Sequence, residues 1–238
     1  MISVLVDERI SAQMERSLLI KGFSPIKLPR HPALGKAIAS HPDSLVFYAD
    51  GELFTPCEYC DIAPYVFSDI RDRHPNIRLH FTSDTLTDKY PQDCSMNAKL
   101  IGKQLFAKEK SLSGAILDFA GRRGYKIINT NQGYPACVSL SLTDGAVITA
   151  DKGLAKTYEA AGITVTLIQN GTIALPPHEY GFIGGCCGIY HDKVYFLGEY
   201  KTHRDAEIIE KVLNKNGFTP VSLSDEPLVD LGGLIFLE

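Results

Sequence analysis

The sequence predicts an α/β fold in which five ββαβ units close into a pseudo-symmetric ring, an α/β-propeller. A repeated order of hairpin, helix and strand is the first observation behind this prediction. The second is the spacing of the hairpin turns, which begin at residues 50, 102, 144, 191 and 232 and are separated by 41 to 52 residues. The third is the division of the last unit between the two ends of the chain, which would remove the exposed strand edges of the array.

The elements follow from apolar periodicity and from turn residues. The first unit combines a hairpin over 44–49 and 52–55, a helix over 62–73 and a strand over 77–82. Its Asp50-Gly51 turn is the best short hairpin signal in the chain. Three further units have the same order. Their segments are the hairpin 97–101 and 104–107, helix 111–123 and strand 125–129; the hairpin 137–143 and 146–149, helix 152–161 and strand 164–168; and the hairpin 181–190 and 193–198, helix 205–213 and strand 220–223.

The fifth unit is split between the ends of the chain. A hairpin is predicted over 228–231 and 234–237, and the N-terminal segment supplies a strand over 2–6, a helix over 11–22 and a strand over 24–28. We therefore expect a single domain over 1–238. Its repeats cover approximately 44–82, 95–129, 136–168, 183–223, and 228–238 joined with 2–28. The alternative is an open α/β sheet, in which no helix covers the last hairpin and the termini lie far apart.

Composition restricts the classes of partner and compartment. The chain has 28 acidic and 24 basic residues, and its net charge of −4 argues against a nucleic-acid partner. No apolar run has the length of a membrane-spanning helix, and the N-terminus lacks the basic region and cleavage site of a signal peptide. We therefore expect a cytoplasmic protein whose six cysteines are reduced and form no disulfide framework.

Several motifs resemble a known group of enzymes. Gly184-Gly185-Cys186, followed by the strand 194–198, resembles the Glu-Gly-Gly-Asp hairpin of dimethylarginine hydrolases and agmatine deiminases. His41-Pro42-Asp43 before a Leu-Val-Phe strand also resembles a segment of those enzymes. The chain is thus similar over its whole length to the pentein, or guanidine-group-modifying enzyme, superfamily. This resemblance implies five ββαβ units around a pseudo-fivefold axis and a small guanidino or amidino ligand.

A narrower resemblance rests on three further segments. They are 93–98 (Asp-Cys-Ser-Met-Asn-Ala), 181–185 (Gly-Phe-Ile-Gly-Gly) and 230–233 (Asp-Leu-Gly-Gly). These segments are similar to a bacterial family known mainly by the pentein fold, from which no activity can be transferred. The chain also departs from the enzymes of the superfamily, because Ile183 and Cys186 replace the two acids of the Glu-Gly-Gly-Asp motif and the C-terminal His-Cys pair is absent.

The inner strands predict which side chains line the axis, since alternate residues of a strand face opposite sides. Counted back from the turns, the odd positions are small and polar, whereas the even positions are mostly apolar. The odd set is Ser95, Asn97, Cys137, Ser139, Gly184 and Cys186, and the even set includes Ala98, Leu100, Val138, Leu140, Leu142, Cys187 and Ile189. We expect the odd set to face the axis and the even set to face the helices.

Two cysteines are the candidate nucleophiles, because a catalytic thiol must be open to substrate and activated by a neighbouring group. Cys137 and Cys186 have the predicted axial orientation. Carboxylates are needed to hold a planar guanidinium cation. The candidate substrate-binding residues are Asp93, Asn97, Ser139 and Asp230, with His178 as a further group that could orient or protonate the substrate.

The same cysteines have a structural interpretation, because free Cys is among the most buried residue types. Cys57 and Cys60 are interpreted as structural, since no second pair of ligands with zinc-site spacing accompanies them. No metal or other cofactor is predicted.

Two functional hypotheses follow. The first is a cysteine-dependent hydrolase or transferase that acts on a guanidino or amidino small molecule at an axial pocket. The second is a non-catalytic pentein that binds a small ligand or a protein or ribosome partner, as a ribosome anti-association factor in the superfamily does. The missing His-Cys motif favours the second hypothesis, and the sequence determines neither the substrate nor the oligomeric state.

Overall fold

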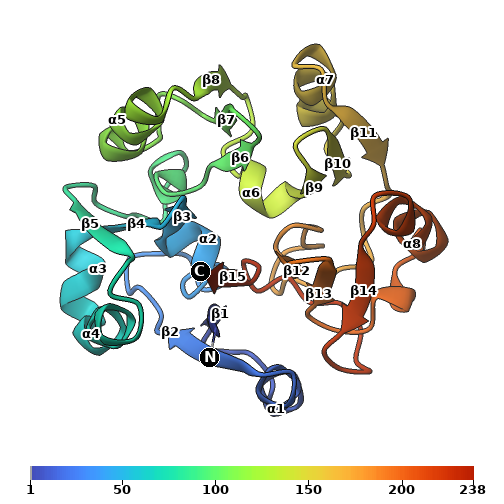
Figure 1. Cartoon of the computed structure of the whole chain (residues 1–238), viewed down its shortest axis with the longest axis horizontal. Helices are drawn as coiled ribbons and strands as arrows, with labels where there is room; N and C mark the ends of the chain where they lie inside the picture. The colour runs from blue at the N-terminus through green and yellow to red at the C-terminus, as the bar shows by residue number, and fades with distance from the viewer. Residues whose placement is uncertain (1) are drawn as a thin grey trace.

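The computed structural model describes residues 2–238 and contains five three-stranded sheets arranged around a central axis (Figure 1). In every sheet the central strand pairs with one antiparallel and one parallel neighbour. Helices connect the central strand to its parallel partner. The predicted ring of five ββαβ units is therefore confirmed, and we call the units blades 1 to 5.

The bounds of the elements are as follows. Blade 1 contains β3 (Phe47–Ala49), β4 (Glu52–Pro56), α3 (Cys57–Ile62), α4 (Pro64–Arg73) and β5 (Arg78–Thr82), preceded by α2 (Pro42–Leu45). Blade 2 contains β6 (Lys99–Ile101), β7 (Gln104–Ala107), α5 (Gly114–Arg123) and β8 (Lys126–Asn129). Blade 3 contains β9 (Ser139–Thr143), β10 (Ala146–Thr149), α7 (Lys152–Ala160) and β11 (Thr164–Leu167), preceded by α6 (Pro135–Val138). Blade 4 contains β12 (Cys187–Tyr190), β13 (Lys193–Phe196), α8 (Ala206–Lys215) and β14 (Thr219–Ser222). Short 3₁₀ turns cover Gln92–Cys94 and Tyr200–Thr202.

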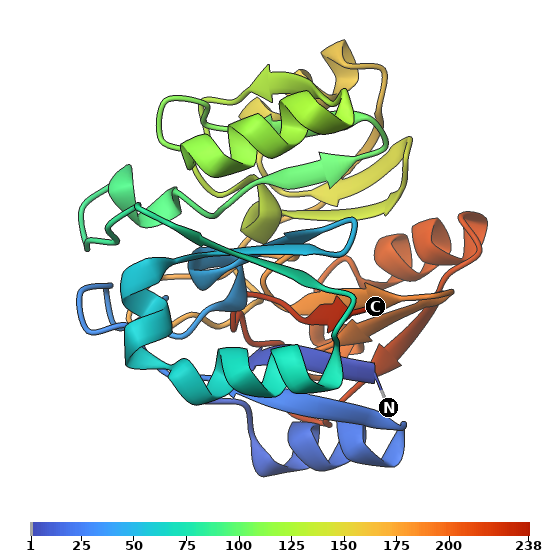
Figure 2. The same cartoon turned by 60° about the vertical axis from the view of Figure 1, so that its left-hand side comes forward.

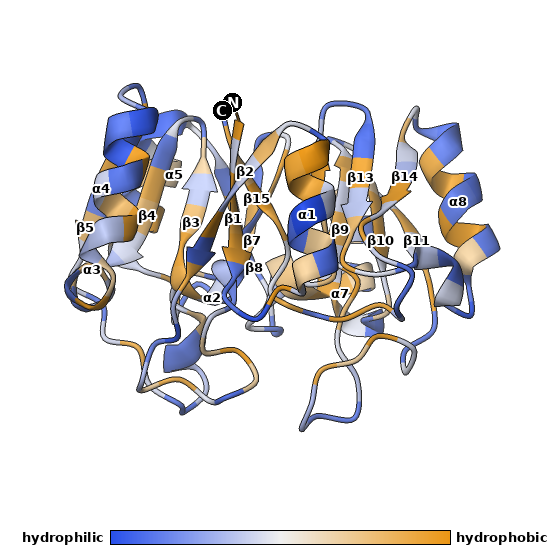
Figure 3. Ribbon diagram, turned by 90° about the horizontal axis from the view of Figure 1, so that it is seen from below, coloured by the Kyte–Doolittle hydropathy of each residue, from blue (hydrophilic) through white to orange (hydrophobic). Residues whose placement is uncertain are grey.

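The two ends of the chain build blade 5. Strand β15 (Ile235–Leu237) pairs antiparallel with β1 (Ile2–Asp7), and β1 pairs parallel with β2 (Phe23–Leu28) after α1 (Ala12–Ile20). The N- and C-terminal ends of the described chain consequently lie side by side (Figure 3). The terminal segments close the ring, as predicted.

The hairpin predicted over 228–231 and 234–237 does not form. The partner of β15 is β1, so the chain ends stand where the other blades have a hairpin turn. Gly232 and Gly233 have φ angles of 71° and 77°, and the amides of Leu231 and Gly233 donate to the carbonyl of Gly185. This segment therefore pairs with the residues before β12 and not with β15.

Local sequence explains why the other elements begin and turn where they do. Ser11 caps α1 by accepting a hydrogen bond from the Met14 amide, and Asp151 caps α7 by accepting one from the Leu154 amide. The β3–β4 turn places Asp50 and Gly51 at φ angles of 50° and 72°, which suits this residue pair. Among residues 2–238, no helix combines the length and the hydrophobicity needed to span a bilayer.

Five hydrophobic clusters fill the spaces between neighbouring blades. The longer helices α1, α4, α5, α7 and α8 lie toward the rim, whereas the strands and the short helices α2 and α6 lie nearer the axis (Figure 1, Figure 2). For example, Phe119 of α5 packs against Phe47 and Phe54 of blade 1, and Tyr158 of α7 packs against Phe106 of blade 2. Each of these helices thus fills the gap between its own sheet and the preceding one.

This packing corrects the predicted division of the inner strands into an axial and a helical face. In blade 3, Val147 packs in the cluster around α7, whereas Leu140 and Ile148 pack in the cluster that contains residues of α8. Both faces of the sheet are therefore buried, one by the blade's own helix and the other by the next blade. The inner strand thus approaches the axis with its backbone edge, and its apolar side chains point toward the neighbouring cores.

Ring closure should contribute strongly to stability, because Leu237 of β15 is fully buried in the cluster between blades 5 and 1. We expect Leu237→Ala to lower the free energy of unfolding by about 3 kcal/mol, the usual cost of a large cavity in a core. Leu19→Ala, at a position that is 53% exposed, should change it by less than about 0.5 kcal/mol. Urea denaturation of both variants measures the difference, and equal midpoints would contradict a role of β15 in closure.

Candidate functional site

A cavity of about 820 Å³ opens at the end of the axis where the long interstrand loops gather. These loops lie opposite the chain ends in the side view (Figure 3). Four carboxylic acids line the cavity, with one lysine and two histidines. These ionisable residues are Lys36, His41, Asp43, Asp88, Asp93, His178 and Glu179. The cavity is therefore acidic, and its other lining residues include the aromatic Tyr134, Tyr180 and Phe182 and the thiol of Cys137.

Cys137, one of the two candidate nucleophiles, borders this cavity. It lies on the one-turn helix α6, and its sulfur is 3.3 Å from Oδ2 of Asp230. Burial raises the pKa of the thiol well above its ordinary value, and the carboxyl groups of Asp230 and Asp43 raise it further. In the ligand-free protein Cys137 is consequently a protonated thiol that donates to Asp230.

Asp230 is almost fully buried and is held from three directions. Besides the thiol of Cys137, it accepts hydrogen bonds from the amides of Phe182 (2.9 Å) and Gly232 (3.0 Å). Glycine permits this close packing, because a Cβ at Gly181 or Gly185 would overlap the Asp230 side chain. The 181–185 segment thus serves as a glycine-lined seat for a buried carboxylate.

Asp43 is the second carboxyl beside the thiol. It is contributed by the short helix α2, and its Oδ2 atom has no hydrogen-bond partner within residues 2–238. Burial raises the pKa of Asp43 to about 8, and repulsion from Asp230 adds to the shift. The Asp43 carboxyl therefore retains its proton at neutral pH unless a cation binds beside it.

His41 lies between the carboxylates. Its Nε2 atom is 3.9 Å from Oδ2 of Asp7, and its Nδ1 atom is 3.9 Å from Oδ1 of Asp43 and from Oδ1 of Asp230. Neither nitrogen makes a hydrogen bond within the described chain. Burial lowers the pKa of His41, against the opposing attraction of Asp230 and Asp7. The imidazole is thus neutral and unengaged, and it borders the cavity.

Arg9 neutralises one of these acids and fixes a wall of the cavity. It forms an ion pair with Asp7 at 2.6 Å and donates to the Ala37 carbonyl at 2.8 Å. Asp7 also accepts a hydrogen bond from Ser40. The carboxyl of Asp7 is therefore engaged, whereas Asp43 and Asp230 have no ion-pair partner among Lys and Arg in residues 2–238.

Asp93 lies on another side of the cavity. It accepts a hydrogen bond from the hydroxyl of Tyr134, and its Oδ1 atom is without a partner in the part of the chain that the structure describes. Burial and the neighbouring Asp93 raise the pKa of Tyr134 well above its ordinary value, so this phenol remains a donor. One oxygen of Asp93 is thus buried without a hydrogen-bond partner in residues 2–238.

The structure brings together four of the residues that the sequence singles out. Cys137, Asp93 and His178 border the loop-side cavity, and Asp230 contacts Cys137 directly. Asn97 lies next to them. Its side-chain Nδ2 donates to the backbone carbonyl of Asp43, and its Oδ1 accepts from the backbone amide of Ala136. Asn97 therefore joins α2 to α6 and positions Asp43 and Cys137 without bordering the cavity itself.

Cys186 and Ser139 lie elsewhere. Cys186 is fully buried in the core between blades 3 and 4, where its thiol donates to the Ile183 carbonyl. Ser139 is also fully buried and exchanges a hydrogen bond with the Tyr158 hydroxyl on α7. Neither side chain borders the loop-side cavity. The two remaining conspicuous cysteines, Cys57 and Cys60, are free thiols on α3, and no group of three or more His, Cys, Asp or Glu in residues 2–238 is placed to hold a metal ion.

Sequence reasoning did not place His41, Asp43, Tyr134 and Phe182 at the site, although all four border the loop-side cavity. The His41-Pro42-Asp43 motif was available as a signal, since a histidine and an acid next to a proline before a buried strand suggest a functional loop. Tyr134 and Phe182 carry no such signal. They reach the cavity only because the loops 130–138 and 175–186 converge on the axis.

The chain matches the model of the family of unknown function DUF6873 over residues 5–235 and belongs to that family. A search of curated protein sequences finds no significant match. Among solved structures, similarity extends to the amidinotransferase SxtG of the saxitoxin biosynthetic pathway from Microseira wollei, with a TM-score of 0.58 and 8% identity over 94% of this chain and 77% of that one.

Two further structures show the same similarity. DDAH from Pseudomonas aeruginosa has a TM-score of 0.57 and 8% identity over 94% of this chain and 92% of that one. Agmatine deiminase from C. jejuni has a TM-score of 0.55 and 10% identity over 92% of this chain and 75% of that one. These similarities show that the chain has the pentein fold.

The raised pKa of Asp43 should make the free energy of unfolding depend on pH. Between about pH 4 and pH 8 the unfolded chain loses the Asp43 proton while the folded protein keeps it, so the free energy of unfolding falls as the pH rises. Asp43→Asn removes this pH-dependent loss of stability. We expect the variant to gain at least about 2 kcal/mol over the wild type at pH 8 and much less at pH 5. Denaturation at both pH values tests this, with Asp192→Asn at an exposed turn as control.

The glycine seat makes a second prediction. A Cβ at position 185 would overlap the Asp230 carboxyl, so Gly185→Ala should destabilise the protein by about 2 kcal/mol or more. Gly121→Ala is a suitable control, because nothing lies within 4 Å of a Cβ at that position on α5 and alanine favours a helix by about 1 kcal/mol. Thermal unfolding of both variants gives the comparison, and a Gly185→Ala protein as stable as the wild type would refute the seat.

Proposed function

We propose that this protein is a cysteine-dependent hydrolase or amidino-group transferase that acts on a small guanidino or amidino compound in the loop-side cavity. The observation that carries the proposal is the Cys137 thiol, which borders an acidic cavity and lies 3.3 Å from the Asp230 carboxylate. A thiol with adjacent proton acceptors, next to groups that attract a planar cation, is the arrangement such chemistry requires.

Binding of the cation would rest on unengaged carboxyl oxygens. Asp43 and Asp93 each present an oxygen that has no partner within residues 2–238, and carboxylates hold guanidinium groups through paired charge-assisted hydrogen bonds. The rings of Tyr134 and Phe182 border the same space, where an aromatic face would favour a cation. The cavity therefore offers charge, hydrogen-bond acceptors and aromatic surface to one class of ligand.

The bound cation would also change the state of the thiol. Without a ligand, burial and two neighbouring carboxyls hold the pKa of Cys137 high. A guanidinium placed between Asp43 and Asp93 adds a positive charge close to the sulfur, which favours the thiolate. We expect Cys137 to ionise only when substrate is bound, with its proton passing to the Asp230 carboxylate that it contacts.

The proposed reaction has two halves. The Cys137 sulfur forms a bond to the central amidine carbon, and the bond from this carbon to the leaving nitrogen breaks. The departing amine takes the proton that Asp230 received from Cys137. Water or an acceptor amine then attacks the carbon and passes a proton to Asp230, and the carbon–sulfur bond breaks. The sulfur regains its proton from Asp230, while Asp43 stays ionised as the partner of the bound cation.

The structural relatives support this chemical class. An amidinotransferase, DDAH and an agmatine deiminase share the fold of this chain. His41, which is neutral and has no hydrogen bond within the described chain, could accept or return a proton during the second half of the reaction.

A non-catalytic binding protein is the second candidate, and one observation favours it. The Cys137 thiol is buried and surrounded by acids that raise its pKa, which opposes thiolate formation. In this case the cavity would hold a guanidino or amidino compound through Asp43 and Asp93 without reacting with it. The two candidates differ in turnover and not in the ligand.

The two candidates can be separated by a substrate panel of arginine, agmatine and methylarginines, with release of ammonia or amine and formation of a ureido product as readouts. We expect Cys137→Ala to lower turnover by about a thousandfold or more while ligand binding, measured by calorimetry, persists. Cys60→Ala, on the outer helix α3, is the matched control. Binding without turnover would select the binding protein, and neither binding nor turnover across the panel would overturn both proposals.

A further inference from the structure

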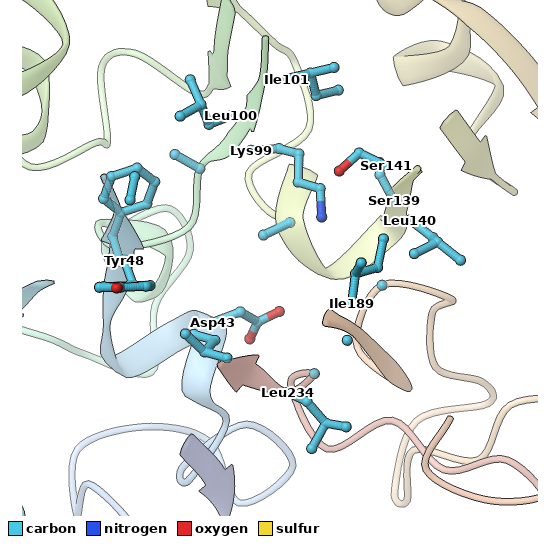
Figure 4. A pocket seen from close by; sticks show the side chains of 18 of the residues that line it. Asp43, Tyr48, Lys99, Leu100, Ile101, Ser139, Leu140, Ser141, Ile189 and Leu234 are labelled. Carbon is cyan, nitrogen blue, oxygen red and sulfur yellow. The ribbon is translucent and has the colours of Figure 1, made fainter. Parts of the chain in front are cut away.

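A second cavity, of about 480 Å³, lies at the opposite end of the axis, where the hairpin turns meet (Figure 4). The turn residues Asp50, Gly102 and Asp144 border it, together with residues of the innermost strands of all five blades. Polar and apolar groups both line it, and Ile189 and Leu234 are among its apolar side chains. This turn-side cavity is distinct from the site of Cys137, which does not border it.

One side chain gives the turn-side cavity its chemistry. Lys99 of β6 directs its amino group into the space, and the hydroxyl of Ser141 faces the same region (Figure 4). Lys99 is partly buried, and its amino group has no carboxylate within 4.0 Å in residues 2–238. Burial lowers the pKa of Lys99, because it disfavours the charged ammonium. A bound anion would stabilise the ammonium and offset this cost.

We propose that the turn-side cavity binds a small organic monocarboxylate, whose carboxylate group pairs with Lys99 and Ser141 and whose short apolar chain packs between the inner strands. The volume lies within the range of pockets that enclose a small molecule. The ammonium and the hydroxyl supply two donors from neighbouring blades, which a single carboxylate can accept together.

The other charges of the turn-side cavity restrict the ligand to one negative charge. Lys99 is the single cationic side chain among the residues that border it, whereas Asp43, Asp50 and Asp144 are acidic. A phosphate or a dicarboxylate would bring a second charge toward these acids. Asp43 would still tolerate a monoanion, since burial keeps its carboxyl protonated at neutral pH and able to donate a hydrogen bond.

Lys99 has one competing explanation, which is that it only balances the charge of Asp43 across the axis. No ion pair within 4.0 Å joins Lys99 and Asp43 in residues 2–238, so the two groups are not in direct contact. Empty volume also remains between the lysine and the apolar wall. Charge balance would need neither this volume nor the Ser141 hydroxyl.

The test uses isovalerate as the probe, with isovaleramide as the neutral isostere, in titration calorimetry on the full chain. We expect saturable binding of isovalerate and none of the amide. Lys99→Met should weaken binding at least tenfold, Ser141→Ala severalfold, and Lys126→Met, on the outer strand β8, should leave it unchanged. Cys137→Ala should also leave it unchanged, which makes the result independent of the proposed enzymatic function.

Two results would overturn the proposal. One is the absence of binding to the wild type at millimolar isovalerate, and the other is binding that Lys99→Met does not weaken. Circular dichroism establishes that Lys99→Met is folded, and Lys99→Arg, which keeps the charge, should retain binding within a few fold. If Lys99→Met does not fold, the Ser141→Ala comparison decides, and unchanged affinity there would count against the site.

Discussion

The pairing of β15 with β1 is the constraint on which the rest of the structure depends. It joins two segments more than 200 residues apart and supplies the fifth blade, without which blades 1 and 4 would expose their apolar faces. It also fixes the path of the segment 228–234, which leads into β15. This segment crosses the axis, where the Gly232 carbonyl accepts a hydrogen bond from the Asp43 amide and the Asp230 side chain contacts Cys137. Closure of the ring thus builds the site.

The acids around this crossing are unfavourable for folding stability. Arg9 neutralises Asp7, but Asp43 and Asp230 share a buried space without a Lys or Arg partner in residues 2–238. Burial and mutual repulsion keep a proton on Asp43 up to about pH 8. Native proteins accept such unfavourable charge arrangements where function requires them. A cation that enters the cavity would relieve this repulsion, so ligand binding and folding stability depend on the same electrostatic term.

The sequence predicted the fold well because its evidence is local. Turns such as Asp50-Gly51 and helix caps such as Ser11 act within a few residues, and their repetition revealed the ring. The hairpin predicted around Gly232-Gly233 was wrong, because the pairing partner of β15 comes from the other end of the chain. The assignment of Cys186 to the axis was also wrong, since this residue lies in the core between blades 3 and 4. Ser139 does border the turn-side cavity on the axis, although its hydroxyl bonds to Tyr158. The site residues that do meet are Cys137, Asp93 and Asp230, because each belongs to a loop or short helix that ends at the axis. The alternation of side chains along a strand cannot predict which loops end there.

In a pseudo-symmetric ring the side chains around the axis can change while the fold persists. Every blade sends equivalent segments to the same axis, so a functional group can enter the central cavity from any of them. Here the thiol comes from α6 before blade 3, and the two adjacent acids come from α2 before blade 1 and from the segment before β15. The aromatic wall comes from the loops before blades 3 and 4. The C-terminal segment, which has neither cysteine nor histidine, contributes a carboxylate instead. The absence of a sequence motif from one blade therefore does not decide whether the site can act, because the axis collects its groups from all five.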